Sequence, residues 1–89
     1  MLSSATKTWI DTQALRFAMF GGGLHGANVQ VAADIALDQL WSLCCTGSGP
    51  EGLDWCSQRL DVYRELQRAM RAAVLREQRA NQYTLALGL

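Results

Sequence analysis

Three glycines spaced as G-x-G-x-x-G, Gly21, Gly23 and Gly26, stand directly before a segment that we predict to be helical. In that setting, backbone N–H groups and the positive end of a helix dipole can hold a phosphate. A dinucleotide-binding fold, however, needs a strand before the glycines and a second strand that ends in an acidic ribose ligand, and the sequence indicates neither. We therefore interpret the glycines as a hinge between two helices, with an anion bound at the helix start near Asn28 as the alternative.

The single histidine, His25, and the cysteines Cys44, Cys45 and Cys56 are the soft ligands and nucleophiles of the chain. Zinc sites favour C-x-x-C pairs, whereas adjacent cysteines on a helix point about 100° apart. A cysteine nucleophile would also need an orienting group and an oxyanion hole, and the sequence indicates neither. We therefore predict no metal and no cofactor. The odd number of cysteines suits a reducing compartment, and their default interpretation is as small buried apolar residues.

Two carboxylates, Asp34 and Asp38, lie one helical turn apart, with Gln30 and Ser42 on the same stripe. This spacing could pair an acid with a base or bind a divalent ion. The interpretation we favour is a stripe that faces water or arginine, because neighbouring like charges repel each other. Since no acid, base, nucleophile or ligand set converges, we predict that the protein is not an enzyme.

Arginines gather on one face of the C-terminal region. Two basic and five acidic residues precede position 59, a balance of −3, whereas six basic and three acidic residues follow from there, a balance of +3. A plain solvated face, an acidic partner protein and a nucleic acid would each fit this pattern. The chain as a whole has no basic excess, which makes nucleic acid the weaker fit. The predicted partner-binding residues, within an arc of about 80° on a helical wheel, are Arg64, Arg68, Arg71 and Arg79.

Hydrophobic periodicity predicts three helices and an all-α fold in a single domain of 89 residues. We expect residues 1–7 to fray and the first helix to span Thr8–Phe20, with a strand for residues 15–20 as the alternative. The central helix should span Asn28–Cys45. The third should run from about Leu53 to about Gln82, without an internal glycine or proline.

The predicted central helix is apolar almost all the way round, and we therefore expect it to be buried, with the first and third helices packed around it. The three tryptophans, Trp9, Trp41 and Trp55, should lie in the core by default. A tryptophan that instead lies exposed beside the arginine face would be the best candidate for a binding anchor.

The third helix should be about 45 Å long, at about 1.5 Å per residue. A compact chain of this size has a radius of gyration of only about 12 Å, so the helix should overhang its domain and pair with a second copy. In an antiparallel homodimer that crosses near residue 68, Arg59 would approach Glu77. Both could instead lie on the flank and reach water. The predicted dimer-interface residues are Arg59, Tyr63, Leu66, Met70, Ala73 and Glu77.

The tail 83–89 alternates apolar residues, which indicates either an extended arm docked on a neighbour or a frayed end. A signal peptide and a membrane span are not apparent, so we expect a cytoplasmic protein that does not enter a membrane. No set of motifs identifies a family.

The leading hypothesis for function is a non-enzymatic protein-binding module, a stoichiometric inhibitor or adaptor of the kind that phages and other mobile elements encode. The alternative is a small DNA-binding transcriptional regulator that uses the arginine-rich third helix.

Overall fold

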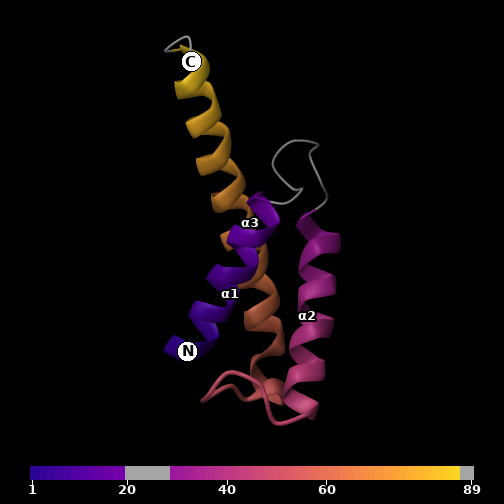
Figure 1. Cartoon of the computed structure of the whole chain (residues 1–89). Helices are drawn as coiled ribbons and strands as arrows, with labels where there is room; N and C mark the ends of the chain where they lie inside the picture. Colours follow the sequence, from indigo (N-terminus) through magenta and orange to yellow (C-terminus); the bar gives the residue numbers. More distant parts are fainter. Residues whose placement is uncertain (20–28, 87–89) are drawn as a thin grey trace.

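The computed structural model describes the backbone of residues 1–19 and 29–86 and the side chains of residues 1–19 and 29–77. Within these ranges the chain forms three helices and no strand: α1 (Ser4–Phe17), α2 (Val29–Cys45) and α3 (Trp55–Ala86) (Figure 1). The all-α prediction is confirmed. The alternative of a strand that begins at residue 15 is wrong for the described residues, because α1 continues to Phe17 and a π-helical turn follows at residues 18–19.

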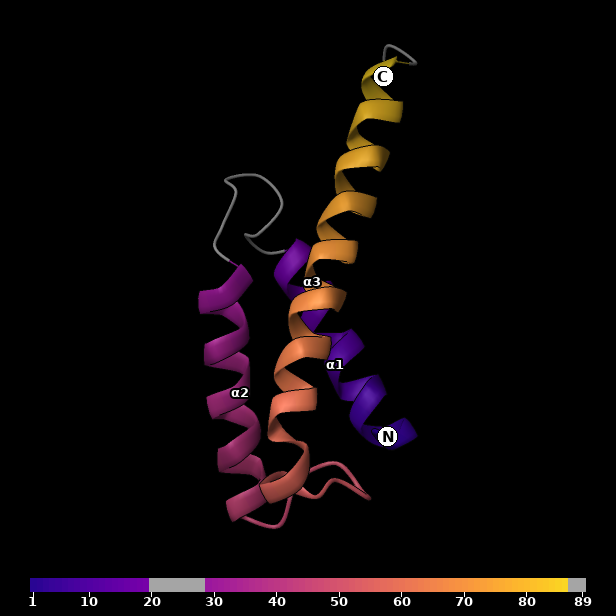
Figure 2. The ribbon, with the colours of Figure 1, turned by 180° about the vertical axis from the view of Figure 1, so that it is seen from behind.

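The middle position belongs to α3 and not to α2. Both α1 and α2 pack against α3 and have little contact with each other (Figures 1 and 2). On α2 only Ala33, Ala36 and Leu40 are buried, whereas Val31 and Ile35 are about half exposed. The prediction of a central buried helix at Asn28–Cys45 is therefore wrong. A helix that is apolar all round needs neighbours on several sides, and among the described residues the only helix packed closely on α2 is α3.

The core is a narrow strip of mostly small side chains. On α3 the helical period predicts a packing face that consists of Trp55, Val62, Tyr63, Leu66, Ala69, Met70 and Ala73. Five of these residues are at most 6% exposed, as predicted, whereas Trp55 and Tyr63 are only half-buried. Small residues on all three helices let the backbones approach closely, and the few large side chains fill the remaining space. The buried cluster consists of Ile10, Ala14, Ala18, Ala33, Ala36, Leu40, Val62, Leu66, Ala69, Met70 and Ala73.

The N-terminus is tied down, so the prediction that residues 1–7 fray is wrong. The Ser3 hydroxyl caps α1 by accepting a hydrogen bond from the Thr6 N–H at 3.2 Å, and it donates one at 2.7 Å to the carbonyl of Glu51. Beside it, the Gln58 side-chain amide donates to the Met1 carbonyl at 3.0 Å. Glycine at position 52 permits this close approach of the loop to Ser3. Its φ is +83°, and a Cβ at this position would lie only 3.0 Å from the Cβ of Ser3.

Beyond its contacts with α1 and α2, the C-terminal half of α3 projects away from the other helices (Figure 2). The molecule measures 49 × 23 × 19 Å, with a radius of gyration of 14.6 Å, against about 12 Å for a compact chain of this length. The predicted overhang is therefore confirmed. Helix α3 begins two residues later than expected and continues to Ala86, so an extended arm is wrong for residues 83–86. Residues 87–89 lie outside the described ones.

Candidate protein-binding surfaces

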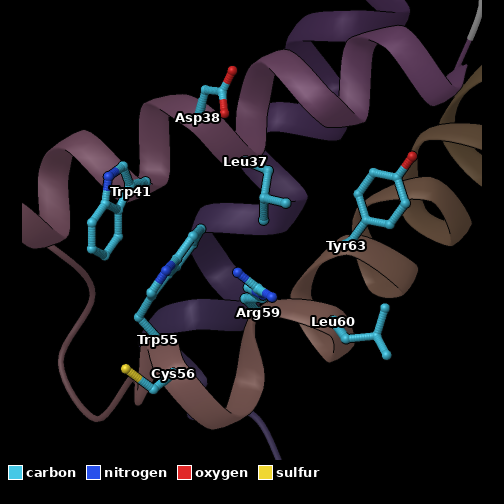
Figure 3. Close-up of a pocket in the computed structure, with 8 residues that line it drawn as sticks. All are labelled: Leu37, Asp38, Trp41, Trp55, Cys56, Arg59, Leu60 and Tyr63. Atoms are coloured by element: carbon cyan, nitrogen blue, oxygen red, sulfur yellow. The ribbon is translucent and has the colours of Figure 1, made fainter.

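An open groove runs between α2 and the N-terminal half of α3, on the face shown in Figure 3. Its volume of ≈ 750 Å³ falls in the range of ligand pockets, about 300–1,000 Å³. The side chains are mainly aromatic and aliphatic, with one acidic and one basic group among them. The residues that line the groove are Leu37, Asp38, Trp41, Trp55, Cys56, Arg59, Leu60 and Tyr63.

Two tryptophans form one end of this groove. The ring centroids of Trp41 and Trp55 are 5.2 Å apart and their planes are inclined by 34°. A tilted aromatic pair of this kind contributes about 0.5–1.5 kcal/mol beyond its buried area. Trp41 nevertheless remains 48% exposed, so the expectation of a core position is wrong for it, while Trp9 and Trp55 are half-buried. Trp41 is thus exposed, but it lies in this groove, which Arg64, Arg68 and Arg71 do not line, so it is not the anchor beside the arginine face that the sequence left open.

The other end of the groove is polar. Burial raises the pKa of the Tyr63 phenol, and a hydrogen bond to Asp34, together with the charge of that carboxylate, raises this pKa further, while a hydrogen bond with Gln30 acts in the opposite direction. Asp34 therefore joins α2 to α3 through Tyr63. Asp38, one turn later, is exposed, and Figure 3 shows its carboxylate directed away from Arg59.

The predicted arginine face lies on the outside of α3. Arg64, Arg68 and Arg71 are all exposed, as expected, and the side chain of Arg79 lies outside the described ones. Among the described side chains the one ion pair joins Arg68 to Glu65, and the hydrogen bond from Arg68 lowers the pKa of the Glu65 carboxyl. In the part of α3 whose side chains are described, Arg64 and Arg71 have no such partner.

An exposed leucine continues this arginine face. Leu75 is 54% exposed and lines a shallow groove of ≈ 400 Å³ between α1 and α3. Arg68 and Arg76 from α3 and Asp11 from α1 border the same groove. The surface therefore combines cationic side chains with one large apolar side chain.

The residues predicted for a dimer interface fall into two groups. Leu66, Met70 and Ala73 are at most 4% exposed, because α1 and α2 already cover them within one chain. Arg59 and Glu77 are exposed, and Tyr63 is half-buried at the edge of the groove. A second copy would therefore contact only the exposed members in this conformation.

The cysteines do not cluster with other metal ligands in the part of the chain that the structure describes. Cys44 is half-buried, and burial followed by the charge of Cys45 raises its pKa. Cys45 and Cys56 are exposed, so the interpretation as buried residues is wrong for both, and all three thiols are free. Across the described residues no three His, Cys, Asp or Glu side chains gather as a metal site would require. His25 and the glycines of residues 21–26 lie outside the described ones.

Sequence reasoning missed the groove as a unit. Leu60 could have indicated the groove from the sequence, because it is a large apolar residue well off the packing face of α3. In the structure it is 54% exposed. The sequence gives no such signal at Trp41, since the direction of this side chain relative to α3 depends on how the two helices pack.

Comparison with protein-family models, curated proteins and solved structures finds no match to this chain. In the part of the chain that the structure describes, the helices lack the combination of length and apolar character that crossing a membrane requires.

Proposed function

We propose that the protein is a non-enzymatic, cytoplasmic protein-binding module that acts by covering an acidic surface of a partner protein with the arginine face of α3. The observation that carries the proposal is the stripe formed by Arg64, Arg68, Arg71 and Leu75, which recur every three or four residues along the exposed side of the helix. Protein interfaces are enriched in arginine, and their centres are apolar. The stripe has both properties.

The polarity of the chain supports an acidic partner. Residues from 59 onward carry a balance of +3, and Arg64 and Arg71 are exposed without an ion pair among the described side chains. These two guanidinium groups can therefore bind carboxylates without first losing a partner. An inhibitor or an adaptor would act in this way, through a stoichiometric complex.

A nucleic-acid partner fits the same surface less well. Leu75 lies in line with the arginines, and a phosphate backbone offers nothing that an exposed leucine would bind. The whole chain is also neutral, with eight basic and eight acidic residues. The DNA-binding regulator therefore remains the second hypothesis, and the experiment below distinguishes the two.

The test is affinity purification from host lysate with nuclease treatment, at low and high salt. The Arg64→Glu/Arg71→Glu variant is compared with Lys7→Glu/Arg16→Glu, which makes the same charge change on exposed residues of α1. We expect the wild-type chain and the α1 variant to retain one stoichiometric protein that the α3 variant loses. Retention of the same proteins by both variants would refute the proposal. Nuclease-sensitive capture, together with binding to duplex DNA that falls steeply with salt, would favour the regulator.

A further inference from the structure

We infer that the groove between α2 and α3 is the docking site for the overhanging half of α3 from a second copy of this chain, in an antiparallel homodimer. The inference is independent of the proposed function, because it uses neither Arg64 nor Arg71. It combines two features of the described fold, an open groove at one end of α3 and a projecting helix at the other end.

The overhang begins where the core ends. Among the side chains of α3 that the structure describes, Ala73 is the last that is buried, Val74 is half-buried, and those of residues 75–77 are exposed. From Ala73 to Ala86 the helix continues for about 20 Å, at about 1.5 Å per residue. This length exceeds that of the groove, which spans Trp55 to Tyr63 on α3, or about 12 Å.

One face of α3 carries both the groove lining and its proposed occupant. At about 100° per residue, Arg59, Tyr63, Val74 and Glu77 lie within an arc of about 60°. A two-fold interface requires such self-complementarity, since each surface patch meets the same patch of the other copy. The half of this face around Arg59 and Tyr63 in one copy would therefore meet the half around Val74 and Glu77 in the other copy.

The register follows from the charges. Arg59 is exposed within the groove and Glu77 is exposed on the overhang, and neither has an ion pair among the described side chains. A crossing near residue 68 places residue 59 of one copy beside residue 77 of the other, and it places Tyr63 beside the turn that contains Val74. Because the axis is two-fold, the Arg59–Glu77 pair forms twice.

The exposed area is consistent with a missing partner. The chain exposes 6088 Å², whereas a folded monomer of 9.8 kDa exposes about 5,200 Å². The excess of about 900 Å² is close to the roughly 800 Å² that each partner buries in an interface of standard size. Leu60 at 54% and Trp41 at 48% exposure are the large apolar side chains that the second copy would cover.

The test is the mass in solution, measured by sedimentation equilibrium over a range of concentrations. Twice the chain mass of 9.8 kDa is expected for the wild-type protein. Arg59→Glu and Glu77→Arg should each raise the dimer dissociation constant about tenfold or more, because each creates two like-charge contacts. The combined Arg59→Glu/Glu77→Arg variant should restore dimerisation. Arg16→Glu, an exposed charge change on α1, should have no effect, and circular dichroism confirms that each variant is folded.

Three outcomes would overturn the inference. The first is a wild-type chain that stays monomeric at every concentration. The second is a dimer that neither single reversal weakens, and the third is a combined variant that remains as weak as the single ones. A monomer that captures another protein and loses it on Leu60→Asp would assign the groove to a different occupant.

Discussion

Replacement of Leu66 by alanine tests the central position of α3. Leu66 is fully buried in the core that α3 shares with α1 and α2, and truncation of such a leucine costs about 2–5 kcal/mol through lost burial and the cavity left behind. A chain of 89 residues has a total stability of about 4–13 kcal/mol at about 0.05–0.15 kcal/mol per residue. The substitution should therefore remove a large fraction of the stability of the fold.

Urea unfolding at a fixed protein concentration measures this loss. With a slope of about 1 kcal/mol per M, the midpoint should fall by about 2 M or more. The concentration is held constant because association would add to the apparent stability. The matched control is Ile35→Ala on α2, where the side chain is 55% exposed, and the cost should stay within about 0.5 kcal/mol. Equal costs for the two variants, or a larger cost at Ile35, would refute the arrangement with α3 in the middle.

Three further predictions concern the N-terminal cap, the loop beside it and the groove. Ser3→Ala should cost about 1 kcal/mol in urea unfolding, because it removes the cap of α1 and the bond to Glu51. Gly52→Ala should cost at least about 1 kcal/mol in the same assay, because φ is +83° and the added Cβ would crowd Ser3. The raised pKa of Tyr63 should fall in Asp34→Ala, as followed by phenolate absorbance in a Tyr83→Phe background. Because this pKa is raised on folding, its contribution to stability should be complete below about pH 10 and lost as the pH rises through the raised value.

The local pattern predicted the helices and the packing face of α3, but not which helix lies in the middle. A period of about 3.6 residues identifies Val62, Leu66 and Ala73 as one face, because that information is contained in the helix itself. The number of helices that pack around a given helix is not contained in its own sequence. Val31 and Ile35 on α2 look like core residues in the sequence, yet they are about half exposed, because none of the other described helices covers that side of α2.

At the N-terminus and in the groove, the sequence pattern likewise did not predict contacts between residues that are far apart in the chain. Ser3 reads as a residue of a polar tail, and its acceptor is the carbonyl of Glu51, 48 positions away in the sequence. Trp41 and Trp55 meet only because α2 and α3 are rotated to bring their rings within 5.2 Å. Exposure of Arg64 and Arg71 could be predicted, since the solvated side of an amphipathic helix follows directly from its apolar side.

The docking of α1 on α3, and not on its sequence neighbour α2, has a consequence for engineering. Helices α1 and α2, which residues 20–28 connect in the sequence, have little contact with each other, so no extensive interface between the two helices fixes their spacing. Doubling the length of such a connection costs only about 0.6 kcal/mol. A fluorescent reporter inserted there would leave the Ser3 cap, the arginine face and the groove intact, and it would allow association to be followed by energy transfer between chains.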